Sequence, residues 1–250
     1  MIDFISDLHL QATDPANFAA WRTYMQQTQA DAVFILGDLF EVWVGDDAAD
    51  TLATGDISFE GRCAEVLRQT AVHRAVFFMH GNRDFLVGKR FCDALGVTWV
   101  QDPFVLEFPG ERWVLSHGDA LCLADVDYQR FRETVRSDLW QATFLAKPLA
   151  ERRGIARDLR QQSQAHQLAV TSYADADSEA TLALLTGASA SHLIHGHTHK
   201  PADHRHGEGL SRHVLSDWDV EASPARAQVL RLTCRQSGPV SMSRIAPSKI

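Results

Sequence analysis

Several short clusters of Asp, His and Asn in this chain have the residue types and spacing of metal ligands. Asp7 and His9 are two residues apart, and so are His197 and His199. If each pair continues a strand, alternation directs both side chains of the pair to one side. The remaining clusters place Asp38 after Gly37, Asn82 and Arg83 after Gly81, and His117 alone.

The chemistry of these donors limits the metals that they suit. Carboxylate, amide and imidazole groups without a thiolate favour Mn, Fe or Zn over Cu(I) or an iron–sulfur cluster. Two metal ions about 3.5 to 4 Å apart can activate a water and clamp phosphoryl oxygens. Each cluster alone is a weak signal, because such short motifs arise by chance. Only their combination and their order along the chain are informative.

Short apolar runs precede the clusters and must position them. Such runs are typical of strands buried on both faces. Helical patterns lie between several runs, such as the stripe of Phe18, Trp21 and Met25, and the stripe of Phe91 and Leu95. Alternating strands and helices predict an α/β fold with ligand sites at the carboxyl ends of strands. The runs are residues 2–6, 33–36, 76–79, 113–115 and 193–194.

Two further features predict mixed sheets. Residues 104–108 and 112–116, joined by Pro109 and Gly110, are typical of a hairpin, and we expect a second hairpin from the runs near Val214 and Val229. The tail after Gln236, rich in Ser, Pro and Gly, is expected to be loosely ordered.

Composition excludes several classes of protein. With 250 residues and 45% apolar content, we expect a single domain over residues 1–250. The formal net charge of -8 argues against nucleic acid as a partner. The four cysteines form no C-x-x-C pair, so neither a disulfide framework nor a zinc ribbon is expected. The N-terminus lacks a signal peptide and no run is long enough to span a membrane, which predicts a cytoplasmic protein. No obligate protein partner is inferred.

The middle of the chain has a different texture. A helical tract carries Tyr128, Phe131, Val135 and Leu139 on one face, breaks near Pro148, and is richer in Lys and Arg than in acids. We interpret residues 126–170 as a helical lid insertion that covers the strand ends. The alternative is a set of ordinary solvated helices with basic faces.

The order of the clusters, D-x-H, GD, GN, H and GHxH, each behind an apolar run, resembles the signature of the calcineurin-like metallophosphoesterases over most of the chain. The resemblance implies an αββα sandwich with mixed sheets and a dinuclear centre in which Asp38 is the bridge. We expect Asp38, Asn82, Arg83 and His197 to be the catalytic residues. The implied ligands are Asp7, His9, Asp38 and His199 for one metal, and Asp38, Asn82, His117 and His197 for the other.

Arg83 departs from the general pattern of that superfamily, in which a His commonly follows the Asn. An Arg cannot donate a proton near neutral pH, but it binds phosphate oxygens well. This favours a leaving group that hardly needs protonation, such as a phosphate with a second pKa of about 6. A pyrophosphate bond fits that requirement.

The chain is similar, more narrowly, to the UDP-2,3-diacylglucosamine diphosphatases of lipid A biosynthesis. Local matches cover residues 39–47, 81–85, 117–119 and 196–199. The similarity implies Mn-dependent hydrolysis, with Fe or Zn as alternative metals, in which water attacks the α-phosphorus of the UDP-linked lipid. It releases UMP and 2,3-diacylglucosamine 1-phosphate. It also implies peripheral association with the cytoplasmic face of the inner membrane, and a lid that forms a chamber for acyl chains.

Substrate contacts carry over from that family unevenly. Asn82, Arg83 and His197 match within the motifs, and Asp125 and Ser163 match beyond them. Gln167 stands where the family often has Asn, and Val170 stands where it often has Lys, which puts one contact in doubt.

Two other functions stay open. One is a dinuclear phosphoesterase for another nucleotide pyrophosphate or a cyclic nucleotide, and the other is a non-catalytic scaffold. Other polar residues are expected to have structural roles. We expect His195 and His80 to be hydrogen-bonded packing residues, and His204 and His206 to lie in a solvent-exposed loop. The acids Asp46, Asp47, Asp50 and Asp56 are expected to form a solvated loop, and Asp84 and Asp119 to orient ligands.

Overall fold

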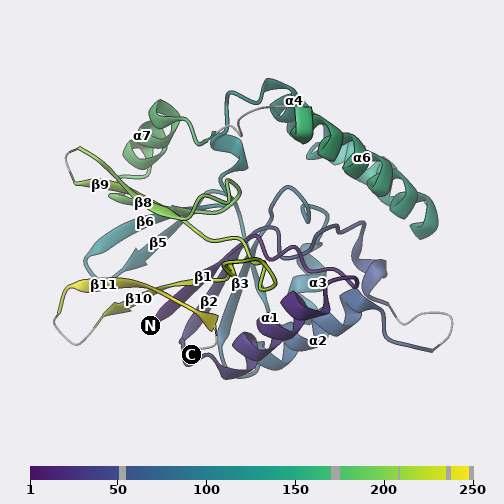
Figure 1. Ribbon diagram of the computed structural model, residues 1–250, viewed down its shortest axis with the longest axis horizontal. Helices are drawn as coiled ribbons and strands as arrows, with labels where there is room; N and C mark the ends of the chain where they lie inside the picture. Colours follow the sequence, from purple (N-terminus) through teal and green to yellow (C-terminus); the bar gives the residue numbers. More distant parts are fainter. Residues whose placement is uncertain (51–54, 170–174, 208, 235–237, 248–250) are drawn as a thin grey trace.

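Two β-sheets packed face to face form the centre of the protein (Figure 1). The computed structural model describes residues 1–50, 55–169, 175–207, 209–234 and 238–247, with the backbone alone for 162–169. The first sheet has the order β11-β10-β1-β2-β3-β4, and the second has the order β5-β6-β7-β9-β8. Their strands are β1 (Ile2–Ile5), β2 (Ala32–Leu36), β3 (Ala75–Met79), β4 (Thr98–Val100), β5 (Phe104–Phe108), β6 (Glu111–Ser116), β7 (His192–His195), β8 (Ala202–His206), β9 (Leu210–Val214), β10 (Val229–Cys234) and β11 (Val240–Ile245).

Helices cover both outer faces of this pair of sheets. In Figure 1, α1, α2 and α3 lie on the first sheet, α7 lies on the second, and α4 and α6 lie beyond the strand ends. The helices are α1 (Pro15–Gln27), α2 (Phe59–Ala71), α3 (Lys89–Ala94), α4 (Val126–Val135), α5 (Asp138–Leu145), α6 (Leu149–Ala169) and α7 (Ser178–Gly187), with short 3-10 turns η1 (Asp46–Ala49) and η2 (Asp119–Leu121).

Three apolar clusters hold the layers together. Phe4 and Phe34 of the first sheet pack with Leu115 and Ile194 of the second in the cluster between the sheets. A larger cluster joins the other face of the first sheet to α1, α2 and α3, and a third joins the second sheet to α7. Burial of these faces is the main driving force for the layered arrangement. The predicted αββα sandwich with mixed sheets is confirmed.

The central strands β1, β2 and β3 run parallel, so their carboxyl ends meet at one edge of the first sheet. Strands β6 and β7 are likewise parallel in the second sheet. The parallel strands therefore bring the five polar clusters to one end of the sandwich.

Helix α1 begins where Asp14 accepts a hydrogen bond from Asn17 N, with Pro15 at the first helical position.

The hairpin predicted at residues 104–116 is confirmed by the antiparallel pairing of β5 with β6. The hairpin predicted between the runs near Val214 and Val229 is wrong, because β9 pairs with β7 and β8 while β10 lies in the other sheet. The prediction of a loose tail is also wrong for residues 240–245, which form β11 on the edge of the first sheet. Apolar strand patterns do not specify which strands pair.

The predicted helical tract consists of three helices, α4, α5 and α6, whereas the sequence predicted a tract with one apolar face and a single break near Pro148. Ser137 separates α4 from α5, because it is the N-cap of α5 and its side chain accepts a hydrogen bond from Trp140 N. Val135 is buried, but Phe131 and Leu139 are 38% and 79% exposed, so the expected single apolar stripe is wrong. None of the described helices combines the length and the apolar character that a membrane crossing requires.

Candidate metal centre

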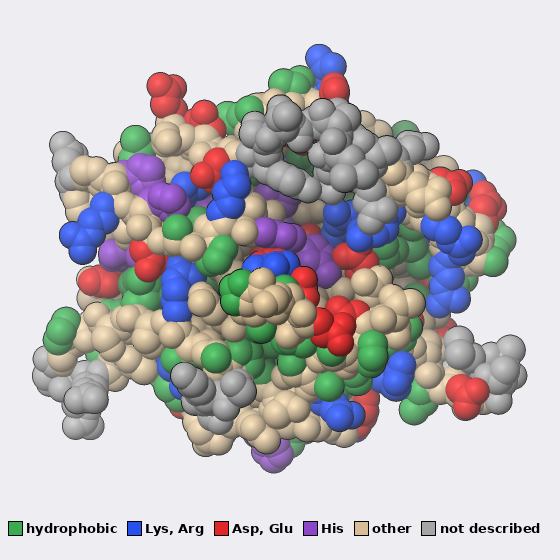
Figure 2. Space-filling model, in the orientation of Figure 1, with side chains coloured by type: hydrophobic (Ala, Val, Ile, Leu, Met, Phe, Trp, Pro, Cys, Tyr) green, Lys and Arg blue, Asp and Glu red, His purple; other side chains and the backbone are tan. Residues whose placement is uncertain are grey.

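All seven predicted ligands lie at one end of the sandwich, each just after a strand. Asp7 and His9 follow β1, Asp38 follows β2, and Asn82 follows β3. The second sheet contributes His117 after β6 and His197 and His199 after β7. Figure 2 shows histidine side chains gathered near the centre of one face, with acidic side chains beside them.

The backbone at the clusters is left-handed rather than extended. Asp7, His9 and Asp38 have φ values of 54°, 49° and 52°, and His197 and His199 have values of 66° and 53°. Non-glycine residues rarely adopt this region, and such strain gathers at functional sites. The predicted convergence of the pairs is therefore correct, but strand alternation is the wrong reason for it.

Asp7, His9 and His199 form one group of candidate ligands. His9 Nε2 lies 3.2 Å from His199 Nε2, and His199 Nε2 lies 3.4 Å from Asp7 Oδ1. Two imidazole lone pairs at this distance repel unless a proton or a cation lies between them. Asp38 Oδ2 is 4.0 Å from His9 Nε2, which places its carboxylate at the edge of the same group.

Asn82 joins the remaining imidazoles. Its Oδ1 lies 2.9 Å from His117 Nε2 and 2.9 Å from His197 Nδ1. His117 Nε2 also lies 3.7 Å from Asp38 Oδ1, and Asp7, Asp38 and His117 form a second group of candidate ligands. Asp38 thus lies between the two groups, with one oxygen toward each.

Glycines allow the segments to approach this closely. A Cβ on Gly196 would lie 2.3 Å from Asp7 Oδ2, and a Cβ on Gly81 would lie 2.1 Å from Asp38 Oδ1. Gly37 has a φ of 86°, which permits the turn before Asp38. The glycines in the motifs therefore serve the packing of the carboxylates.

Burial and charge oppose each other among the titratable groups of this centre. Burial lowers the pKa of His117, but the charges of Asp38, Asp7 and Asp119 raise it to about 9. Burial and the charge of His117 lower the pKa of His197 to about 4. Burial raises the pKa of Asp7, but its hydrogen bond and charge interaction with His199 hold it well below its usual range. The buried Asp7 carboxylate thus stays negative and attracts positive charge to the centre.

Two further carboxylates that the sequence did not indicate lie behind the histidines. Glu41 Oε2 lies 3.0 Å from His9 Nδ1, and Asp217 Oδ2 lies 3.9 Å from His199 Nδ1. Arg226 Nε in turn donates to Asp217. Glu41 lies only three residues after Asp38, but no local pattern gives its role, and Asp217 lies in a segment without any motif.

Helix α4 contacts the Asn82 side of the centre. Tyr128 stacks on His197 with ring centroids 5.9 Å apart, and its hydroxyl donates to Asp119 at 2.6 Å. Arg136 Nη2 donates to Gly81 O at 3.0 Å and contacts Asp119 at 3.3 Å. Asp119 therefore ties the helix to the ligand loops, which extends the orienting role expected of it.

Arg83 lies in the same loop as Asn82, and its backbone N donates to Asp38 Oδ1 at 2.8 Å. Its side-chain Nε is buried, and no described residue accepts a hydrogen bond from it. A buried guanidinium atom without an acceptor is suited to an anionic ligand.

The residues present fit a pair of divalent cations. Carboxylate, amide and imidazole atoms face one another within a few ångströms, the ring nitrogens of His9 and His199 converge, and Asp7 stays negative.

The residues predicted for the substrate are less well defined. The Asp125 carboxylate caps α4 by accepting a hydrogen bond from Tyr128 N at 3.0 Å. Ser163 and Gln167 belong to α6, but their side chains lie outside the described residues, and so does all of Val170.

Most residues that the sequence analysis set aside have structural partners. His80 Nε2 lies 2.6 Å from Val87 O, and His195 Nδ1 lies 2.8 Å from Gly196 O, as expected. Asp84 accepts hydrogen bonds from Leu39 N and Gly81 N and so fixes both ligand loops.

Two of these expectations are wrong. His204 and His206 are half-buried on β8 and do not lie in an exposed loop. Asp46 accepts hydrogen bonds from Trp43 Nε1 and Gly88 N, and Asp47 pairs with Arg152 of α6, so these two acids are not simply solvated.

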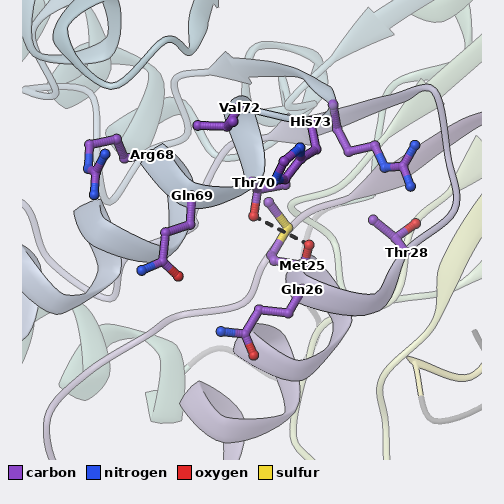
Figure 3. Close-up of a pocket in the computed structure, with 9 residues that line it drawn as sticks. Met25, Gln26, Thr28, Arg68, Gln69, Thr70, Val72 and His73 are labelled. Atoms are coloured by element: carbon purple, nitrogen blue, oxygen red, sulfur yellow. Dashed lines mark hydrogen bonds between the residues drawn. The ribbon is translucent and has the colours of Figure 1, made fainter.

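A separate cavity of about 460 Å³ lies between the C-terminal ends of α1 and α2 (Figure 3). Thr70 faces it, but its hydroxyl is already bonded to Val66 O and Met25 O. It contains none of the predicted site residues.

Comparison with known proteins agrees with the geometry. The sequence profile of the family described as calcineurin-like phosphoesterase matches residues 1–201. A UDP-2,3-diacylglucosamine hydrolase of Chromobacterium violaceum is 43% identical over 226 residues, which cover 87% of this chain and 90% of that protein. The proteins of the same name from Ralstonia nicotianae and Pseudomonas aeruginosa are 43% and 40% identical, and the matches cover 92% and 86% of this chain and 88% and 90% of those proteins.

Proposed function

The chain belongs to the calcineurin-like phosphoesterase family, and we propose that it hydrolyses the pyrophosphate bond of UDP-2,3-diacylglucosamine in lipid A biosynthesis. Water attacks the α-phosphorus, and the products are UMP and 2,3-diacylglucosamine 1-phosphate. The names of relatives that are 40–43% identical over most of both chains support this substrate. The observation that carries the proposal is the convergence of the seven donor side chains, with Asp38 at their centre, beside Arg83.

The cofactors that we propose are two Mn²⁺ ions, with Fe or Zn as alternatives. When bound, such a pair activates a water and stabilises the charge on the phosphoryl oxygens. Asp38 would bridge the ions, because its two oxygens face different groups of donors. The other ligands would be Asp7, His9 and His199 on one side and Asn82, His117 and His197 on the other.

The protein's own groups position the diphosphate. Arg83 binds phosphate oxygens with its guanidinium group, whose buried Nε has no acceptor among the described residues, and Asn82 and His197 contact the same phosphate. The leaving group is a phosphate, whose low pKa removes the need for a proton donor at Arg83. Asp125, Ser163 and Gln167 are proposed to contact the rest of the substrate.

The lid supports a lipid substrate and peripheral binding to the cytoplasmic face of the inner membrane. Five of the seven large apolar side chains that are exposed among the described residues lie within the lid or just before it. Basic residues such as Arg130 lie beside them and would meet anionic headgroups. The exposed apolar side chains here are Leu123, Val126, Phe131, Leu139 and Leu145.

Release of UMP from UDP-2,3-diacylglucosamine, measured with and without Mn²⁺, tests the proposal. We expect turnover only with the metal, and much slower cleavage of cyclic nucleotides and of free dinucleotides. Faster cleavage of those small substrates would reassign the substrate. Absence of bound metal, with stability unchanged in chelator, would favour a scaffold instead.

A further inference from the structure

We infer that Glu41 is a positioning residue that orients His9 for cation binding, and that Arg160 of α6 holds Glu41 in place. The inference deepens the proposed function and rests on it, since it concerns the cation proposed to lie beside Asp7, His9 and His199. It links the lid to one half of the metal centre through a chain of three side chains.

The backbone holds Glu41 and His9 next to each other. Glu41 N donates to Leu10 O at 3.1 Å, and Leu10 N donates to Leu39 O at 2.9 Å. These bonds bring the segment after β2 against the segment after β1. The Glu41 side chain is buried, and its Oε2 lies 3.0 Å from His9 Nδ1.

This contact selects the form of His9 that can bind a cation. The negative charge of the carboxylate beside Nδ1 favours the tautomer that carries its proton on Nδ1, where the charge attracts it. The lone pair of Nε2 then faces His199 Nε2 at 3.2 Å and Asp38 Oδ2 at 4.0 Å. A carboxylate behind a ligating histidine also fixes the direction of the ring and raises its basicity.

Arg160 completes the chain from the lid. Its guanidinium forms an ion pair with Glu41 Oε1, the oxygen that does not face His9. A buried carboxylate without a counter-charge would be costly, and Arg160 is 28% exposed and supplies that charge. The position of α6 therefore controls the carboxylate that orients His9.

A second ion pair between α6 and the same region provides a matched comparison. Arg152 pairs with Asp47, and its guanidinium also donates to Val44 O. Among the described residues, the partners of Arg152 and Asp47 include no candidate ligand. If Glu41 served only to fasten the lid, loss of either carboxylate would have the same effect on the metal centre.

The test measures Mn²⁺ affinity of the whole protein without substrate, by titration against a competing indicator. We expect Glu41→Ala to weaken the affinity for one of two Mn²⁺ ions by about 10- to 100-fold, which is the usual loss when a residue that orients a metal ligand is mutated. Asp47→Asn should stay within about 2-fold of the wild type, because its ion pair reaches no donor. Arg160→Gln should weaken the affinity in the same direction by less, and Arg160→Lys should restore it.

Thermal unfolding of each variant without metal separates loss of folding from loss of affinity. A folded Glu41→Ala protein with wild-type affinity would overturn the inference, and so would an equal loss in Asp47→Asn. Wild-type Mn²⁺ affinity in Arg160→Gln would contradict the claim that Arg160 of α6 holds Glu41 in place. If the wild-type protein binds Mn²⁺ but does not release UMP, the proposed substrate fails while the role of Glu41 stands.

Discussion

Replacing Gly81 by alanine is expected to damage the centre without removing any candidate ligand. The added Cβ would lie 2.1 Å from Asp38 Oδ1 and 2.4 Å from Asp38 N, where ordinary contacts begin at 3.4 Å. Relief of this overlap requires Asp38 to move by about 1 Å relative to Gly81. A misplacement of that size can lower turnover about 100-fold, and overpacking typically destabilises a protein by ~1–3 kcal/mol.

The assays are UMP release at saturating Mn²⁺ and urea unfolding. Gly187→Ala is the control, because Gly187 ends α7 and an added Cβ would meet no atom within 4 Å. That change should stabilise the protein by about 0.4–1 kcal/mol and leave turnover unchanged. Wild-type turnover together with wild-type Mn²⁺ affinity in Gly81→Ala would refute the argument that close packing of Gly81 positions Asp38.

Three further predictions follow from individual contacts. Arg83→Ala should raise KM at least 10-fold with both Mn²⁺ ions retained, and loss of metal in this variant would contradict the role of Arg83 in phosphate binding. Removal of metal with EDTA should abolish UMP release and Mn²⁺ should restore it, whereas activity that survives exhaustive chelation argues against a metal mechanism. Asp3→Ala should destabilise the protein by about 3–5 kcal/mol in urea unfolding, because buried Asp3 pairs with Arg231 at 2.6 Å. The kcat of the folded protein should stay unchanged, because Asp3 lies within β1 whereas the ligands follow the strand ends. A small loss of stability there would show that Arg231 finds other partners.

The layered fold could be predicted because its main signals are local. Short apolar runs, each followed by a polar cluster, identified β1, β2, β3, β6 and β7, and Gly96 marked the end of α3. The pairing of β9 could not be read in the same way, since an apolar strand pattern does not name its neighbour. The segment between β9 and β10 crosses to the site, where Trp218 N donates to Asp7 O at 3.0 Å.

The candidate site was predictable in its residue types but not in its geometry. The seven donors stand in motifs, whereas the left-handed backbone of Asp7, His9 and Asp38 is imposed by contacts between segments distant in sequence. The roles of Glu41 and Tyr128 at the site gave no signal, because their partners lie on other elements and become neighbours only in the folded chain. A residue that orients a metal ligand is therefore harder to recognise from the sequence than the metal ligand itself.

Anomalous diffraction at the manganese edge, on crystals grown with Mn²⁺, tests the central claim most directly. We predict two peaks about 3.5 to 4 Å apart. One should lie beside Asp7, His9 and His199 and the other beside Asn82, His117 and His197, with Asp38 between them. A diffraction map with no manganese within reach of Asp38 would contradict the proposed centre.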